Sequence, residues 1–460
     1  MNSLFPSHIY QARRERLNAT FSEGIALFLS NNESPANYPA NSYHYRQDSN
    51  FLYFFGLSLP GIVGVMDFNR QKSILFGDDF TIDDIIWMGD QPKLSELAAS
   101  VAVDEVRPLA ELPAFLKHKE VYFTPPYRAE NKIELARLLE KNIETLTPSV
   151  ELIKKIVSLR ELKSPEEILQ MEIANNIGVC MHSMVMKHCK PDITEQELFG
   201  FAEGIALSLG NGVSFPIILS QNGQTLHNHN HSLTLKKGRL LVMDAGAEDK
   251  MNYCSDHTRT LPVSGTFTQK QKEIYETVYQ AQMAAIANCK PGIQNIENHK
   301  VAVTVLTEGL QKIGLMKGNI EESVALGAHA LFMPHGLGHQ IGLDVHDMED
   351  LGENFVGYDE TIKRSSIFGW GALRMAKTLQ PGHVITIEPG IYFIPHLIDI
   401  WKSEKKLEAF INYDKVEAYR DFGGIRIEDS VLITKTGHQV LGPHLPKSVA
   451  EIETILNGVR

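Results

Sequence analysis

Four carboxylates in the second half of the chain occupy positions where burial would require a charge partner. Asp244 ends the apolar run in VMDAG, and Asp256 stands twelve residues later at the start of the next strand-like run. Glu388 lies in TIEPGIYF and Glu428 in IRIEDSV, both of which read as apolar strands. A carboxylate in an apolar strand is costly unless it is paired or binds a metal. An ion pair or a strand-end turn would explain one such residue, but four in one domain favour a metal site.

Three histidines, His335, His339 and His346, fall within MPHGLGHQIGLDVHD. The first two have the spacing of a zinc-protease helix, but Gly-Leu-Gly separates them and no glutamate does. Two glycines in one turn cost about 2 kcal/mol of helix propensity, so the stretch predicts loop and strand. A dinucleotide-binding loop also fails, because the glycines form GxGxxxG, one residue off the fingerprint.

The charges of this set indicate how many ions it could hold. Four carboxylates balance two divalent cations, and one glycine-flanked imidazole completes the set. An oxygen-rich set without a thiolate suits hard or borderline ions, which points to a bridged dinuclear site.

Two domains are expected to position these residues, the first α/β and the second α+β. Residues 1–161 alternate strand-like runs (GIALFL, GIVGVMDF) with helical ones (IYQARRERL, SELAASVAV). Ser164 can cap the first helix of a second domain, with Pro165 in its first turn and Glu167 closing a capping box. The second domain, residues 162–460, mixes helices with strands, and its segment 397–419 is expected to pass over the pocket. No repeat at a fixed period is evident.

Composition narrows the possible partners. A net charge of −12 argues against a nucleic-acid or anionic-membrane surface. No apolar run approaches the roughly 20 residues that span a bilayer. The four cysteines form no CxxC and no evident disulfide framework, so a reduced cytoplasmic compartment is expected.

The motifs MDAG…SD, HGLGHQIGLDVHD, TIEPGIYF and GGIRIEDS, in this order, carry a resemblance. The chain resembles the proline-specific metallopeptidases, aminopeptidase P and prolidase, from about residue 8 to residue 455. SYHYRQDSNFLYFFGL looks like the entry motif of their non-catalytic α/β domain. The resemblance implies that a pita-bread catalytic domain, of the creatinase and methionine aminopeptidase type, follows that domain.

The resemblance also implies a metal-ligand set. Asp244 would hold one metal, Asp256 and Glu428 would bridge both, and His339 and Glu388 would hold the second. The two aspartates are twelve positions apart in this chain, where the family usually has them eleven apart, and the extra residue is expected in the tip EDKMN. Placed in the strand instead, it would turn Asp256 to the wrong side.

Further residues match the family's pocket. His227 in TLHNHNH, His335 and His346 match histidines that contact the substrate and the tetrahedral intermediate. Arg426 matches an arginine near the site, with an exposed strand residue as the alternative. Arg374 resembles a prolidase clamp for the dipeptide carboxylate, with a surface arginine as the alternative. His229 and His231, beside His227, have no match and are interpreted as loop residues.

The implied reaction is hydrolysis of the N-terminal Xaa-Pro bond by a hydroxide that bridges two metal ions, and the ligand types favour manganese. Glu388 would carry the proton, and His346 and His227 would stabilise the oxyanion or the substrate. The substrates would be Xaa-Pro peptides or dipeptides, and the family suggests a homodimer. An Xaa-Pro aminopeptidase is the primary hypothesis, and Arg374 would favour a strict dipeptidase. A metal-free creatinase-like hydrolase and a non-enzymatic binding module remain as remote alternatives.

Overall fold

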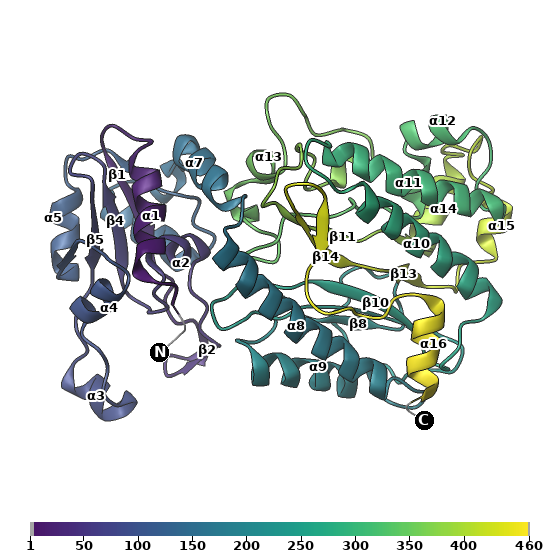
Figure 1. Ribbon diagram of the computed structural model, residues 1–460, viewed down its shortest axis with the longest axis horizontal. Helices are drawn as coiled ribbons and strands as arrows, with labels where there is room; N and C mark the ends of the chain where they lie inside the picture. Colours follow the sequence, from purple (N-terminus) through teal and green to yellow (C-terminus); the bar gives the residue numbers. More distant parts are fainter. Residues whose placement is uncertain (1–3, 459–460) are drawn as a thin grey trace. The chain divides into compact units, whose positions relative to one another are not determined.

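The computed structural model describes residues 4–458 and divides the chain into two compact units. The first unit comprises residues 1–160 and 348–355, and the second comprises residues 161–347 and 356–460. Figure 1 labels their elements along the chain. None of the helices in residues 4–458 combines the length and apolar character of a membrane span.

The first unit is built on a mixed five-stranded sheet with the order β6-β5-β4-β1-β7. Its strands are β1 (Ile25–Leu29), β4 (Val63–Asp67), β5 (Lys72–Phe76), β6 (Glu105–Arg107) and β7 (Val121–Tyr122), beside a hairpin of β2 (Pro35–Tyr38) and β3 (Asn41–Ser42). Its helices are α1 (Ser7–Asn18), α2 (Ser49–Phe55), α3 (Ile82–Met88), α4 (Leu94–Ser100), α5 (Leu112–Leu116), α6 (Ala129–Leu138) and α7 (Val150–Arg160). The strands and helices predicted in this region are therefore present.

The second unit begins with the helix predicted from its capping box. Ser164 accepts a hydrogen bond from the Glu167 amide, and the Glu167 carboxylate accepts one from the Ser164 amide. Pro165 occupies the first turn, where its missing N–H costs nothing. The helices are α8 (Pro165–His188), α9 (Glu195–Leu209), α10 (Gln269–Asn288), α11 (Asn295–Lys312), α12 (Ile320–Ala325), α14 (Pro395–Ser403), α15 (Tyr413–Glu417) and α16 (Val449–Gly458), and α13 (Glu353–Val356) crosses the division between the units.

Short strands of the second unit lie between two helix pairs, α8–α9 and α10–α11 (Figure 1). They are β8 (Ile218–Ser220), β9 (Leu240–Ala245), β10 (His257–Pro262), β11 (Val384–Ile387), β12 (Gly390–Tyr392), β13 (Gly424–Arg426), β14 (Asp429–Ile433) and β15 (His438–Val440). They form the sheets β10-β9-β8, β11-β14-β15 and β12-β13. In each helix pair the connection between the two helices begins with Cys-Lys-Pro, at residues 189–191 and 289–291. The sequence showed no fixed period that would have indicated this local repeat.

The segment 397–419 does not lie over the pocket, so that prediction was wrong. No residue from 397 to 419 lines the main cavity. Trp401, Phe410 and Val416 join the hydrophobic core instead. The Lys317 amide donates to the Phe410 carbonyl at 2.9 Å, which ties the segment to the chain that follows α11. Tyr419 stacks on Phe393, the last residue of TIEPGIYF, with ring centroids 4.8 Å apart, so the segment packs beside this motif without lining the cavity.

Candidate metal site and substrate pocket

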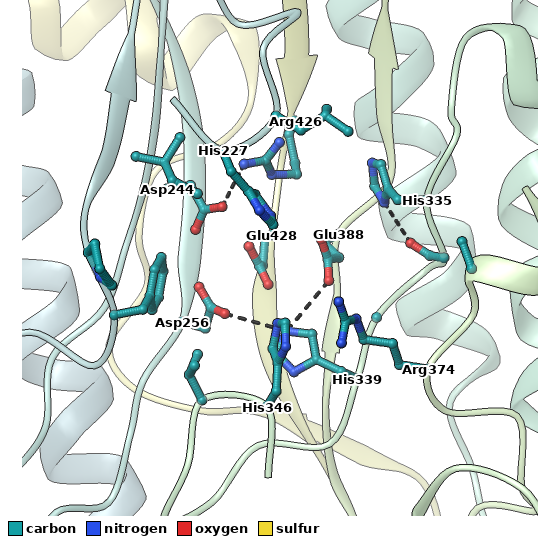
Figure 2. Close-up of a pocket in the computed structure, with 18 of the residues that line it drawn as sticks. His227, Asp244, Asp256, His335, His339, His346, Arg374, Glu388, Arg426 and Glu428 are labelled. Atoms are coloured by element: carbon teal, nitrogen blue, oxygen red, sulfur yellow. Dashed lines mark hydrogen bonds and ion pairs between the residues drawn. The ribbon is translucent and has the colours of Figure 1, made fainter. Parts of the chain in front are cut away.

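A cavity of about 550 Å³ lies within the second unit (Figure 2). Every residue singled out from the sequence lines it: His227, Asp244, Asp256, His335, His339, His346, Arg374, Glu388, Arg426 and Glu428. Phe215, Pro216, Ile218, Leu226 and Val345 add an apolar part to its wall. The cavity thus brings carboxylates, imidazoles and guanidinium groups together beside a nonpolar surface.

The hairpin of β9 and β10 positions two of the carboxylates. Asp244 pairs with Thr258, and the same register continues to the bridge between Glu248 and Cys254. Asp256 therefore shares a face with Thr258, because side chains alternate along a strand, and both aspartates line the cavity. The ladder is unbroken, so the twelve-residue spacing leaves Asp256 on the side of Asp244.

Glu388 and Glu428 stand between strands rather than inside them, contrary to the sequence prediction. β11 ends at Ile387 and β12 begins at Gly390, while β13 ends at Arg426 and β14 begins at Asp429. β11 pairs with β14 and β12 pairs with β13, so the strands change sheet at the two glutamates. Their backbone amides remain bonded, to the carbonyls of Leu337 and Thr258, while their side chains line the cavity.

Three of these residues could bind a cation together. Ligand atoms of Asp256, His339 and Glu428 lie within 4.8 Å of one another. Nε2 of His339 is 3.5 Å from Asp256 Oδ2 and 3.6 Å from Glu388 Oε1 (Figure 2). Nδ1 of His339 lies 3.0 Å from the Gln340 carbonyl, which can only accept, so Nδ1 carries the proton. The lone pair of Nε2 therefore faces the carboxylates, as a metal-binding histidine requires.

The environment of the carboxylates favours a bound cation. Asp244 Oδ1, Asp256 Oδ1 and Glu428 Oε1 are buried and have no hydrogen-bond partner among the described residues. Burial, reinforced by the neighbouring carboxylates, raises the pKa of Asp256 and of Glu428 well above the usual values. Burial also raises the pKa of Glu388 to about 8. Divalent cations would satisfy the lone pairs and offset the repulsion, so the donor set fits them.

A hydrogen-bonded chain runs along one side of the cavity from Asp244 to His335. Arg426 donates from Nη2 to Asp244 Oδ2 at 2.5 Å (Figure 2). It also donates from Nη1 to the Tyr392 hydroxyl at 2.8 Å. That hydroxyl lies 3.0 Å from His335 Nε2, and His335 Nδ1 lies 2.8 Å from the Gly336 carbonyl. Nδ1 must donate to that carbonyl, so Nε2 accepts from Tyr392 and the ring is neutral. Burial, with Arg426 nearby, lowers the pKa of His335 to about 3.

Tyr392 and two threonines are residues that the sequence interpretation missed. Thr258 donates its hydroxyl to Glu428 Oε2 at 2.7 Å. The Thr386 hydroxyl lies 3.3 Å from Glu388 Oε1 and accepts from the His339 amide at 3.1 Å. The spacing offered a signal, because each threonine lies two residues from a predicted ligand, the same-face distance of a strand. Tyr392 lies in the same TIEPGIYF motif as Glu388.

The loop carrying HNHNH presents two histidines to the cavity, His227 and His229. Asn228 donates to the Ser220 hydroxyl at 2.9 Å, which anchors the loop between them. His231 is buried against Phe199 instead, with ring centroids 4.6 Å apart. The interpretation of His229 as a loop residue was thus incomplete, because alternation along this loop gives it the same exposure to the cavity as His227.

One guanidinium and one imidazole side chain, those of Arg374 and His346, complete the wall of the cavity. Arg374 follows the short 3-10 helix Trp370–Ala372 and lines the cavity. Its charge counteracts part of the rise in the pKa of Glu388. The ring of His346 lies 4.1 Å from that of His339, centroid to centroid. Arg374 and His346 therefore face the space beside the carboxylates.

Comparisons with known proteins agree with this architecture. The model of metallopeptidase family M24 matches residues 170–435, and that of the aminopeptidase P N-terminal domain matches residues 10–122. An Xaa-Pro dipeptidase of Homo sapiens is 31% identical, with 98% of this chain and 94% of the relative covered. A probable Xaa-Pro aminopeptidase of Fusarium vanettenii is 33% identical, with 90% of this chain and 88% of the relative covered.

Solved structures show the same fold. A histidine-to-alanine variant of Escherichia coli aminopeptidase P is 28% identical and superposes with a TM-score of 0.82, with all of both chains covered. A zinc-substituted form of that enzyme in complex with product is also 28% identical and gives 0.81, again over all of both chains. The predicted fold, an α/β N-terminal domain followed by a pita-bread domain, is confirmed.

Proposed function

Because the chain belongs to metallopeptidase family M24, we propose that it hydrolyses the N-terminal Xaa-Pro bond of peptides with two divalent metal ions as cofactors. The observation that carries the proposal is the set of buried carboxylate oxygens without hydrogen-bond partners in the described cavity. Such oxygens are costly in a metal-free protein, and cation binding removes that cost. The names of the relatives, Xaa-Pro dipeptidase and probable Xaa-Pro aminopeptidase, support the bond specificity.

The proposed ligands are Asp244, Asp256, His339, Glu388 and Glu428. Asp256 and Glu428 serve both ions, Asp244 the first, and His339 and Glu388 the second. Oxygen-rich ligation with one imidazole and no thiolate favours manganese. When bound, the ions polarise the scissile carbonyl and supply a nucleophile at neutral pH by lowering the pKa of water.

Protein side chains transfer the proton of the attacking water and stabilise the negative charge that develops on the substrate oxygen. Glu388, at the edge of the cavity with its side chain 18% exposed, takes the proton of the attacking water and passes it to the proline nitrogen. His346 and His227 donate to the oxyanion or hold the substrate. Both ring nitrogens of His335 have partners within the protein, so it contacts the substrate through its carbon edge. Arg426 orients Asp244.

A strict Xaa-Pro dipeptidase is the second candidate, and the position of Arg374 favours it. The guanidinium lines the cavity that holds the proposed ligands. It can pair with the free carboxylate of a dipeptide in a bidentate manner. A longer peptide carries its free carboxylate farther from the scissile bond, so it would not present that group to Arg374 in the same way.

Hydrolysis of three peptides tests the proposal. Protein stripped with a chelator and then reloaded with manganese should cleave Ala-Pro or Ala-Pro-Ala at the Ala-Pro bond and leave Ala-Ala-Ala intact. The stripped protein should be inactive. Cleavage of Ala-Pro alone would assign the dipeptidase, and comparable cleavage of Ala-Pro-Ala would assign the aminopeptidase. Loss of all Xaa-Pro cleavage in metal-loaded protein would refute the function.

We also propose that the protein acts as a homodimer in the cytoplasm. The four free cysteines suit a reducing compartment. Light scattering should give twice the 51.5 kDa of one chain, and a value of one chain mass would contradict the dimer.

A further inference from the structure

A buried ion pair joins the start of the second unit to the end of the histidine motif. Lys163 Nζ lies 2.8 Å from Asp347 Oδ2, and the side chains are 1% and 2% exposed. The backbone of Lys163 is fixed as well, because its amide donates to the Gly382 carbonyl at 2.8 Å. A fully buried ion pair stabilises the fold little more than apolar residues of similar volume would, but loss of one partner leaves the other charge buried without a counter-charge. This pair therefore needs an explanation other than stability.

Asp347 closes the loop that connects two pocket histidines. Its amide donates to the Gln340 carbonyl at 2.9 Å, and its Oδ1 accepts from the Asp344 amide at 3.3 Å. Gly342 packs directly on the pair, since a Cβ there would lie 2.6 Å from Asp347 Oδ2 and 2.9 Å from Lys163 Cε. The loop 340–347 is thus folded around the buried ammonium and carboxylate.

The same loop is bonded to the strands that carry the proposed ligands. The Cys254 amide, two residues before Asp256, donates to the Gly342 carbonyl at 2.8 Å. Gln340 forms a bridge with Ile385 of β11. His339 and His346 stand at the two ends of the loop, and their rings lie 4.1 Å apart. A shift at the base of the loop would therefore change where His346 stands relative to the ligands.

We propose that Lys163 and Asp347 are positioning residues that hold His346 beside His339 through the loop 340–347. Neither residue lines the cavity, and the pair acts through the residue next to Asp347. The catalytic consequence rests on the proposed function, whereas the mechanical role does not. Lys163, which lies just after the start of the second unit, would thereby affect turnover.

A double-mutant cycle tests the catalytic consequence. In manganese-loaded protein, Lys163→Met should lower kcat for the preferred Xaa-Pro peptide by about ten-fold or more, with bound metal and KM little changed. In the His346→Ala background the same substitution should change kcat by less than about two-fold, because its target is already gone. Asp347→Asn keeps an acceptor for Lys163 and should show a smaller coupling with His346→Ala in kcat. This second variant keeps the test valid if Lys163→Met fails to fold.

Lys377→Met is the matched control. Lys377 pairs with Glu161 at 3.0 Å, both side chains 14% exposed, and Glu161 precedes Lys163 by two residues. Its effect on kcat should add to that of His346→Ala. Additive losses for Lys163→Met as well would overturn the positioning role and leave a purely structural one.

Hydrogen exchange provides a readout independent of activity. Amides of residues 340–347 should exchange faster in metal-loaded Lys163→Met than in wild type, and Lys377→Met should leave them unchanged. Unchanged exchange in Lys163→Met would overturn the proposal. If the wild type cleaves no Xaa-Pro peptide, the proposed function fails, but this exchange still decides whether Lys163 holds the loop.

Discussion

The hydroxyl of Tyr392 donates to Nε2 of His335 across 3.0 Å, because the Gly336 carbonyl holds the proton of the imidazole on Nδ1. The same hydroxyl accepts from Arg426 at 2.8 Å. Neither His335 nor Arg426 can rearrange without breaking a buried hydrogen bond. A buried donor or acceptor left unpaired costs about 1–3 kcal/mol.

Tyr392→Phe should therefore lower kcat/KM by about ten-fold, since it unpairs one bond at His335 and one at Arg426. Bound metal should remain at the wild-type level, because Tyr392 donates to no proposed ligand. Steady-state kinetics with metal analysis of the same sample checks both. Lost metal with normal turnover per loaded molecule would show that the tyrosine serves the ligands instead.

The metal-free protein should lose stability as pH rises from about 7 to about 8, above the range in which histidines usually titrate. Burial raises the pKa of Glu388 to about 8, so the folded state binds more protons than the unfolded state across this interval. Stability then falls with rising pH, and bound ions should remove the slope by holding the carboxylates ionised. Thermal melts of stripped and manganese-loaded protein across this range measure it. A metal-free slope of the opposite sign would contradict the described electrostatics.

His339→Ala should lower bound metal, whereas His346→Ala should retain it and turn over slowly. His339 directs Nε2 at two carboxylates of the proposed set, 3.5 Å from Asp256 and 3.6 Å from Glu388. Loss of one oxyanion or substrate contact typically costs about 10²–10³ in rate. Elemental analysis after gel filtration separates the two roles. Equal metal loss in both variants would show that the roles are assigned wrongly.

Arg374→Ala should raise KM for Ala-Pro far more than for Ala-Pro-Ala, because in the proposed clamp Arg374, which lines the cavity, pairs with the carboxylate of the dipeptide. Arg364→Ala, in the same segment but outside the cavity lining, is the control. A proportionate KM change for both peptides would remove the clamp and leave Arg374 as an electrostatic neighbour of Glu388.

Asp429→Asn should destabilise the fold by about 3–5 kcal/mol, because it leaves two buried cations without their anion. Arg259 and Lys447 each lie 2.7 Å from Asp429, whose side chain is 4% exposed. Burial opposes ionisation of Asp429, but the two cations outweigh it and lower its pKa. Glu360→Gln, which breaks an exposed pair with Lys363, should cost less than about 1 kcal/mol. Denaturant unfolding of both variants compares them, and similar losses would contradict the expectation.

Local sequence patterns sufficed where the determining contacts are near in the chain. The even spacing of Asp244 and Asp256 gives a shared face only because the hairpin register is unbroken, and the capping box at Ser164 is complete within four residues. Apolar runs indicated strands at Glu388 and Glu428, yet both glutamates sit where a strand changes sheet. That change is set by distant pairing, which periodicity does not encode.

Residues that hold the pocket side chains in place through hydrogen bonds are harder to recognise in the sequence. Tyr392, Thr258 and Thr386 are ordinary strand residues until the fold brings Arg426, Glu428 and His339 to them. The segment 397–419 has the composition of a pocket cover, and its packing against the core depends on the chain that follows α11. In each case the missing information is which remote segment supplies the partner.

The bond between Thr258 and Glu428 joins residues that are 170 apart in the chain. Asp244 and Asp256 are brought together by a single hairpin, but Glu388 and Glu428 reach them only after this long-range pairing. Closing a loop of that length is among the slower steps of chain collapse. The complete ligand set therefore exists only at the end of folding. Manganese added to refolding protein should slow unfolding without accelerating folding, because the ions find their site after the rate-limiting contacts have formed.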